Sequence, residues 1–377
     1  MTRLRRRSVL LGAGALGLVT AGGLTAREVA ARVGAPKPEM TVTRHEPGTA
    51  SGRILFTYGR GAAIAGASGT PLWTTSGAAS YANFQLQQYR GRKVFTWWQG
   101  TGGPGGGGTG SGTDLLTSLT HAPVARIGPA GGYQPDAHEL LLTPSGTALI
   151  TSYARVPHDL SAVGGPASGQ VLNGYCEEVD VASGTVLHRW SALEHVPLTD
   201  SYLPISAAPG QPYDFFHINS ISVTPDGHLL VSARHTCALY KIHRTTGAVL
   251  WRLGGKSSSF SVAPDAVFGF QHHAAYEDPY TIRLFDNGSD GITTLHPSRV
   301  AWIRLDTTAM TATLAASMTV PGIQTFAMGS AQRLPNGNVF VSWGSIARLT
   351  EFSPHGDVLF DATLNFPSYR AFKFDLP

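Results

Sequence analysis

The sequence predicts an all-β protein, specifically a six-bladed β-propeller, on three observations. The 377 residues include 45 Gly and 24 Pro and only 14% charged residues, a composition that favours turns over helical bundles and coiled coils. Asp-Gly and Asn-Gly turn signals separate short β-branched and aromatic runs, which is typical of β-hairpins. The pattern recurs six times, and six four-stranded units in about 340 residues are what a six-bladed propeller requires.

The clearest repeat has a turn at 224–227, strand-sized runs at 228–234 and 239–242, and a last run at 246–251. The other copies lie at 51–56 with 68–73, 89–95, 144–150 with 183–187, 280–285 with 300–303, and 335–341 with 355–359. Because the last strand of a propeller usually closes against the first, we expect residues 36–377 to form one domain. The one weak helical pattern is at 114–119.

Residues 1–35 are expected to form a separate targeting segment. Residues 6–10, Arg-Arg-Ser-Val-Leu, resemble the twin-arginine export motif, and an uncharged run at 9–26 follows. An N-terminal membrane anchor is the alternative, because the 18 uncharged residues are near the lower limit for a membrane span. We expect an exported protein that is extracellular, periplasmic or attached to the cell envelope, with membrane contact only through this segment.

The basic charge of the chain is concentrated in the same segment. The net charge is +4, but residues 1–35 hold six arginines and one acid, which leaves 22 basic and 23 acidic side chains in the rest. The body is therefore nearly neutral, and we expect no nucleic-acid partner.

The sequence also predicts no cofactor or metal motif. Cys176 and Cys237 do not form a Cys-x-x-Cys pair, and either a disulfide or two buried thiols fits their positions. The Gly-rich run at 102–110 is expected to be a flexible excursion from the second blade. The segment at 254–257, Gly-Gly-Lys-Ser, fails as a P-loop because Leu250 stands where the first glycine is required.

Polar residues gather where the inner strands of three consecutive blades are expected to begin or end. His138 opens the third blade, His217 and Asn219 precede a strand at 221–223, Arg234 follows a strand at 229–233, and His272 opens the fifth blade. Alternation along a strand would place His217 and Asn219 on one face. Each residue alone has an ordinary structural explanation, but together they indicate a site in the central channel.

These residues belong to a set of motifs that resembles the arylsulfotransferase (arylsulfate sulfotransferase) family from about residue 53 to residue 377. The motifs are, in chain order, Asp136-Ala137-His138-Glu139, Asp214-Phe215-Phe216-His217-Ile218-Asn219-Ser220, Ser232-Ala233-Arg234-His235, Trp251-Arg252-Leu253-Gly254-Gly255, Phe270-Gln271-His272, Leu284-Phe285-Asp286-Asn287-Gly288, Ser298-Arg299 and Ser368-Tyr369-Arg370. The resemblance implies a six-bladed propeller that transfers a sulfuryl group from an aryl sulfate to a phenol without a phosphoadenosine cofactor.

The resemblance also implies a role for each candidate residue. His272 corresponds to the histidine that is transiently sulfated, although a side chain facing the other way would make His273 the nucleophile. Arg234, Asn219 and the N–H of His217 would stabilise the charge on the sulfuryl oxygens. His217 or His138 would move protons between the phenols, and the kinetics would be ping-pong.

Two other functions remain open at this stage. A non-catalytic exported scaffold is one, because the runs at 68–73 and 246–251 resemble the tryptophan-bearing repeats of quinoprotein and outer-membrane assembly propellers. A metal hydrolase with His138, His217 and His272 as zinc ligands is the other. It is less favoured, because no cluster of carboxylates accompanies them and Arg234 would lie beside the cation. The resemblance is to a compact form of the family, and we expect this chain to lack the separate N-terminal β domain of the longer enterobacterial-type members.

Overall fold

The computed structural model describes residues 37–103, 109–129, 134–205 and 210–376. The segment at 1–35 that is expected to direct export lies outside these residues. Residues 37–377 cluster into one compact unit. Within the described ranges, the only helical segments are 3₁₀ turns at Ser161–Val163, Leu198–Asp200, Pro264–Ala266 and Gly344–Ile346. No helix among the described residues has the length and hydropathy needed to cross a membrane.

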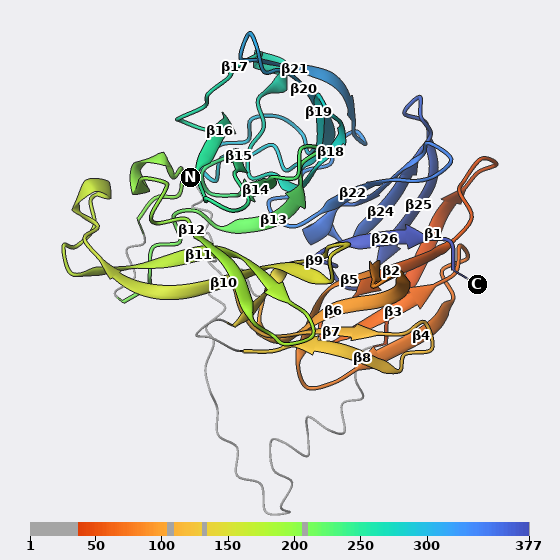
Figure 1. Ribbon diagram of the computed structural model, residues 1–377. Coiled ribbons are helices and arrows are strands. Elements are labelled where there is room, and N and C mark those ends of the chain that lie inside the picture. Colours follow the sequence, from red (N-terminus) through yellow and green to blue (C-terminus); the bar gives the residue numbers. More distant parts are fainter. Residues whose placement is uncertain (1–36, 104–108, 130–133, 206–209, 377) are drawn as a thin grey trace, which may run out of the picture. The chain divides into compact units, whose positions relative to one another are not determined.

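Three of the six sheets contain four strands that are consecutive in the chain (Figure 1). The first is β5 (Ser80–Tyr89), β6 (Arg92–Gly102), β7 (Gly110–Thr117) and β8 (Pro123–Ile127). The second is β9 (Pro135–Leu142), β10 (Thr147–His158), β11 (Gly169–Asp180) and β12 (Val186–Ser191). The third is β13 (Ile218–Val223), β14 (Leu229–Ala233), β15 (Ala238–Ile242) and β16 (Val249–Gly254).

Two further sheets carry a fifth strand at the outer edge. One is β18 (His272–Asp278), β19 (Thr281–Asp286), β20 (Arg299–Asp306) and β21 (Thr311–Met318), with β17 (Ser261–Val262) parallel to β21. The other is β22 (Ser330–Arg333), β23 (Val339–Ser342), β24 (Arg348–Phe352) and β25 (Val358–Leu364), with β1 (Met40–His45) antiparallel to β25.

The sixth sheet closes the ring with strands from both ends of the described chain. Its order is β26 (Ala371–Phe374), β2 (Arg53–Thr57), β3 (Gly61–Ala65) and β4 (Pro71–Ser76), and Phe374 pairs with Arg53. The last strand therefore closes the ring against β2, whereas the first strand, β1, lies at the outer edge of the preceding blade. The six sheets confirm the six-bladed β-propeller.

The predicted turns account for the hairpins, but the helical pattern at 114–119 is wrong. Gly227 and Gly337 follow Asp226 and Asn336 in the inner hairpins of two blades, with φ of +81° and +88° that glycine adopts without a steric penalty. Residues 110–117 form β7, in which Asp114 pairs with Trp98 and Ile127 on the two neighbouring strands. The apolar run was too short to distinguish a helix from a strand. The Gly-rich run joins β6 to β7, and its residues 104–108 lie outside the described ranges.

A buried ion pair lies where the inner strands approach one another. The two Nη atoms of Arg370, just before β26, each donate to an oxygen of Glu139 in β9 at 3.0 Å. Arg370 Nη2 also donates to the main-chain oxygen of Asn219 in β13 at 2.7 Å. Arg370 is 1% exposed, so its charge depends on these partners rather than on water. The pair connects three inner strands beneath the polar residues described below.

The two cysteines do not form a disulfide: both Cys176 and Cys237 are free and buried. Burial raises the pKa of both thiols, and that of Cys237 reaches about 12, so little thiolate is present at neutral pH. We expect both thiols to resist iodoacetamide in the native protein and to react fully in denaturant without prior reduction. A thiol titration that finds fewer than two reactive groups after denaturation would contradict this assignment.

Candidate active site

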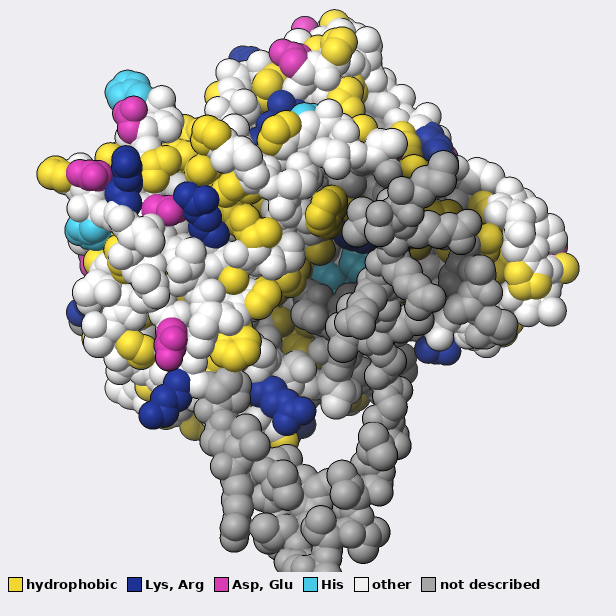
Figure 2. All heavy atoms as spheres, turned by 180° about the vertical axis from the view of Figure 1, so that it is seen from behind, with side chains coloured by type: hydrophobic (Ala, Val, Ile, Leu, Met, Phe, Trp, Pro, Cys, Tyr) yellow, Lys and Arg dark blue, Asp and Glu magenta, His cyan; other side chains and the backbone are white. Residues whose placement is uncertain are grey.

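The structure brings the predicted histidines of three blades together. His138 lies in β9, His217 directly precedes β13, and His272 begins β18. The ring centroids of His138 and His217 are 4.8 Å apart, and Tyr369, just before β26, lies 5.4 Å from His138 and 6.4 Å from His272. Figure 2 shows histidine colour at the bottom of a hollow on one face, with hydrophobic side chains along part of its edge.

His138 and His217 are each held by an aspartate. Nδ1 of His138 contacts Asp136 Oδ1, which also accepts the N–H of His138 at 3.0 Å. Nδ1 of His217 lies 2.5 Å from Asp214 Oδ2. In both residues the other ring nitrogen, Nε2, has no hydrogen-bond partner among the described residues. A carboxylate at Nδ1 holds the ring proton there when a histidine is neutral, so in that form each Nε2 has a lone pair that can accept a proton.

Burial determines the charge of these groups. It lowers the pKa of His217 well below the usual value, with further lowering by His138 and Arg234. Burial also raises the pKa of Asp214, despite the positive charges nearby. Burial alone would raise the pKa of Asp136 as well, but the charge and hydrogen bonds of His138 lower it overall. A neutral His217 is therefore the resting form.

The surroundings of His272 select one tautomer. Its Nδ1 lies 2.8 Å from Oδ1 of Asn287, whose amide nitrogen donates to the main-chain oxygens of Thr325 and Met328. The oxygen of Asn287 must therefore accept, so Nδ1 of His272 carries the proton. Nε2 accepts the N–H of Met328 at 3.2 Å. Burial, followed by the charge of Arg234, lowers the pKa of His272 well below its usual value, so the ring is neutral with its lone pair on Nε2.

The neighbouring His273 has other contacts. Its ring packs against Phe372 of β26 at 5.5 Å, and its Nδ1 accepts the N–H of Ala331 in β22 at 3.3 Å. No ring contact or hydrogen bond joins His273 to His138 or His217 among the described residues. Of the two histidines, His272 is the one that lies with the other candidate residues.

Arg234 lies in the turn after β14, partly covered by its neighbours. Its guanidinium stacks over the ring of Phe270 at 3.9 Å, and Nη2 donates to the main-chain oxygen of Phe326 at 2.9 Å. Nη1 donates to Nε2 of His235 at 2.7 Å. Burial lowers the pKa of Arg234 to about 10, so it remains a cation at neutral pH and can bind an anion.

Asn219 is placed differently from the expectation. His217 has φ of +59° and lies outside β13, and the pairing of β13 with β14 shifts between Ile218 and Ser220. The simple alternation that would put His217 and Asn219 on one face is therefore broken. Asn219 is fully buried, and its amide nitrogen donates to the main-chain oxygen of Gln271 at 2.6 Å. It connects β13 to the residue just before β18, so one of its two amide N–H groups is already bonded inside the protein and is not available to a substrate.

Sequence reasoning assigned no role to several residues that complete this site. They are Asp136, Asp214, His235, Asn287 and Tyr369. All five lie inside the motifs that carried the family resemblance, three of them within three residues of a candidate. An aspartate two or three positions before a histidine was the signal in the sequence for the contacts of Asp136 with His138 and of Asp214 with His217. The sequence does not show which way these side chains point.

The zinc ligand set considered from the sequence does not form a group here. Among the described residues, the cluster with metal-binding atoms close together is Asp214, His217 and His235, with these atoms within 4.8 Å of one another. His138 and His272 are not part of it. The cationic Arg234 donates to His235, which is unfavourable for a second cation at this position.

A cavity of about 310 Å³ lies beside the histidine group rather than over it. It is bounded by the turn after β14, the connection from β16 to β18 and the loop from β19 to β20. Its walls include Tyr202, Cys237, Phe260, Phe268, Asp290 and Leu295. Mostly apolar walls with one carboxylate suit an aromatic group better than a charged one.

One known structure, the first of the two that follow, agrees with this architecture. The chain is similar to a protein of unknown function from Bacteroides caccae, with 12% identity, a TM-score of 0.51 and coverage of 86% of this chain and 99% of that chain. It is also similar to the periplasmic gluconolactonase PpgL of Pseudomonas aeruginosa, with 13% identity, a TM-score of 0.49 and coverage of 86% and 99%. At such identities the likeness concerns the fold alone.

No curated protein matches the chain. The sequence profile described as arylsulfotransferase (ASST) matches residues 85–365, which include four blades and most of a fifth. This range contains His138, His217, Asn219, Arg234 and His272. The chain therefore belongs to the arylsulfotransferase family.

Proposed function

We propose that this protein transfers a sulfuryl group from an aryl sulfate to a phenolic acceptor through a sulfated His272, without a phosphoadenosine cofactor. The observation that carries the proposal is the neutral ring of His272, whose proton is held on Nδ1 by Asn287 and whose lone pair is on Nε2. A neutral imidazole in this tautomer is the form that can attack sulfur.

In the first half-reaction, Nε2 of His272 forms a bond to sulfur while the bond from sulfur to the aryl oxygen breaks. The phenolate leaves with the bonding electron pair and takes a proton from the imidazolium form of His217 or His138, the form that carries a second proton on Nε2 and that the aspartate at Nδ1 stabilises. Arg234 supplies a positive charge for the sulfuryl oxygens. The N–H of Met328 donates to the lone pair of Nε2 in the resting protein, so this hydrogen bond breaks as the bond to sulfur forms, and the freed N–H becomes a further donor to a sulfuryl oxygen.

In the second half-reaction, the acceptor phenol gives its proton to the lone pair on Nε2 of His217 or His138, and its oxygen bonds to sulfur as the bond to His272 breaks. The aspartate at each Nδ1 stabilises the imidazolium that forms. The proton gained here is the one that the next departing phenolate receives, so the cycle balances. Asn219 fits better as a residue that holds β13 to β18 than as a donor to the substrate.

We further propose that the protein acts after export by the twin-arginine route. The support is the motif at residues 6–10. The twin-arginine route exports folded proteins, which is compatible with a propeller whose ring is closed by strands from both ends of the described chain.

The test is intact-mass spectrometry after brief incubation with p-nitrophenyl sulfate. We expect a gain of about 80 Da, one SO₃ group, that is discharged by phenol. His272→Ala should show no gain, while His273→Ala, the matched control, should still be sulfated. A folded wild-type protein that gains no mass with several aryl sulfates would favour the scaffold function, and sulfation that persists in His272→Ala would overturn the assignment of the nucleophile.

A further inference from the structure

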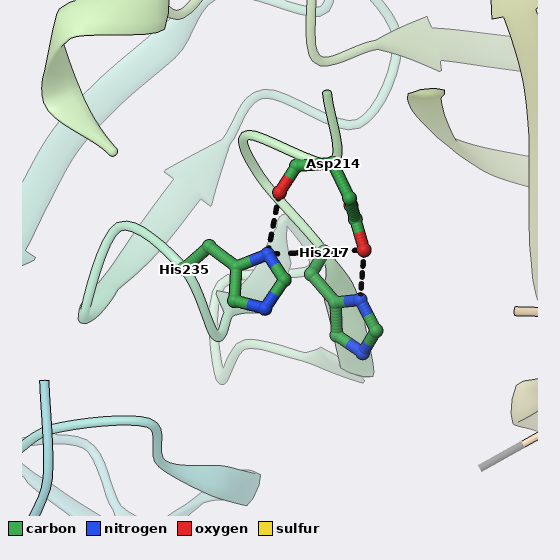
Figure 3. A group of neighbouring side chains, drawn as sticks. All are labelled: Asp214, His217 and His235. Carbon is green, nitrogen blue, oxygen red and sulfur yellow. Dashed lines mark hydrogen bonds and ion pairs between the residues drawn. The ribbon is translucent and has the colours of Figure 1, made fainter. Parts of the chain in front are cut away.

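One residue, Asp214, contacts one functional side chain, His217, and the support of another, His235, which holds Arg234. Its carboxylate oxygen Oδ2 lies 2.5 Å from Nδ1 of His217, and its main-chain oxygen accepts a hydrogen bond from Nδ1 of His235 (Figure 3). His235 in turn accepts a hydrogen bond from Arg234 at its other ring nitrogen, 2.7 Å away. The Asp214 residue therefore reaches His217 directly and Arg234 through His235.

The direction of these hydrogen bonds follows from donor chemistry. A guanidinium can only donate, so Nε2 of His235 must accept and Nδ1 must carry the proton. That proton is donated to the main-chain oxygen of Asp214. Burial lowers the pKa of His235 to about 3, so the ring stays neutral and keeps this tautomer at any working pH. His235 is therefore suited to orient Arg234 and unsuited to donate protons to a substrate.

The hydrogen bonds from Arg234 to His235 and from His235 to Asp214 form a relay, and the ring of His235 is packed on both sides. The ring of His235 lies 4.6 Å from that of His217 and 5.6 Å from that of Phe270, the ring over which Arg234 stacks. Without His235, the guanidinium would keep its contacts with Phe270 and Phe326 but lose the acceptor that fixes Nη1. A cation held by fewer partners samples more orientations, which weakens its interaction with charge that develops at one place.

We propose that Asp214 and His235 are positioning residues, through which one hydrogen-bonded relay sets the tautomer of His217 and the orientation of Arg234. The inference rests on the proposed sulfuryl transfer, because it states how two groups of that site are kept in place. Neither residue touches the reacting atoms. Through this relay, both the acid–base function of His217 and the binding of an anion by Arg234 depend on Asp214, which lies just before β13.

The arm through His235 is tested by a double-mutant cycle. His235→Phe keeps the ring packing and removes the acceptor, and we expect the rate constant for sulfation by low concentrations of p-nitrophenyl sulfate to fall about 10-fold to 100-fold. In an Arg234→Ala background the same change should have less than about a 2-fold effect, because the partner is gone. His235→Gln, whose amide oxygen can accept from Arg234, should recover part of the loss. Equal losses in both backgrounds, with unchanged melting temperatures, would show a merely structural role and overturn the proposal.

The arm through Asp214 is tested with two donors. Asp214→Asn removes the negative charge beside His217. The other charged or titratable groups around that ring are His138, Asp136, His235, Arg234, Tyr153 and His272. We expect a larger loss with phenyl sulfate than with p-nitrophenyl sulfate, because phenolate is the poorer leaving group and needs the proton more. The limb of the pH–rate profile that belongs to His217 should move to lower pH. Equal losses with both donors and an unmoved profile would contradict the relay.

Two further results separate this proposal from the failure of the transferase function itself. If the wild-type protein transfers no sulfuryl group, calorimetric titration with inorganic sulfate still measures the anion site, and His235→Phe should weaken its binding only when Arg234 is present. Titration with Zn²⁺ alone tests whether Asp214, His217 and His235 bind a metal ion instead. Stoichiometric binding that is lost in both Asp214→Asn and His235→Phe would show a metal site in place of the relay.

Discussion

Replacing Arg370 by methionine is expected to lower the free energy of unfolding by about 3–5 kcal/mol, because it leaves the buried carboxylate of Glu139 without its cation. Arg370 donates to both oxygens of Glu139 and to the main chain of Asn219. Methionine fills a similar volume, so the loss reports the missing charge and hydrogen bonds rather than a cavity. Urea unfolding followed by tryptophan fluorescence gives the free energy.

The matched control is Arg348→Met, which breaks a two-bonded ion pair with Asp361 between outer strands. The Arg348 side chain is 29% exposed, against 1% for Arg370, so water replaces its partner and the expected loss is about 0–1 kcal/mol. Removing both charges with Glu139→Leu and Arg370→Met should recover part of the stability. Equal losses of unfolding free energy for the two single variants would show that the buried Arg370–Glu139 pair stabilises the fold no more than the partly exposed Arg348–Asp361 pair.

The second large effect is expected from Asn287→Leu, which should slow sulfation of the protein by about 10³-fold to 10⁴-fold. Leucine cannot accept the proton on Nδ1 of His272, so this tautomer would carry a buried N–H without an acceptor, and only the N–H of Met328 would still favour a lone pair on Nε2. The size of the effect is that of losing the correct histidine tautomer in the serine-protease triad. Rapid-quench measurement of nitrophenol release in a single turnover gives the rate.

Loss of the other bonds of Asn287 needs its own control, since the amide also donates to Thr325 and Met328. Ser298→Ala perturbs the same loops, because the Ser298 hydroxyl donates to the main chain of Asn287 and accepts the N–H of Thr325. It does not touch His272, and we expect less than about a 10-fold effect on the rate. Similar losses in both variants would assign the effect to the loops rather than to the tautomer.

The blades were predictable from the sequence because their signals are local. Turn residues such as Asp226-Gly227 lie within a few positions of the strands that they join, and turn type follows from the residues themselves. The pairing of β1 with β25 gave no such signal, because Met40 meets Leu364 only in the closed ring. The same pattern that located the hairpins was too short at 114–119 to tell a strand from a helix.

The candidate site was predictable at the level of residue types and not of contacts. The motifs pointed to His138, His217, Arg234 and His272, which the structure does gather at one end of the inner strands. Directions depended on backbone conformation, and a residue such as His217 with φ of +59° departs from the alternation that a strand pattern assumes. For this reason the links of Asp214 to His217 and to His235 could not be predicted.

The position of Arg370 also gives the order in which the site can be completed during synthesis. Arg370 is translated 231 residues after its partner Glu139, and Tyr369 beside it packs against His138. A growing chain therefore carries all three histidines for the last 98 positions before Arg370 while Tyr369 and Arg370 have not yet been made. Chains that end before residue 370 should contain the proposed nucleophile and lack the proposed activity, so we expect sulfuryl transfer only from chains that include Tyr369 and Arg370.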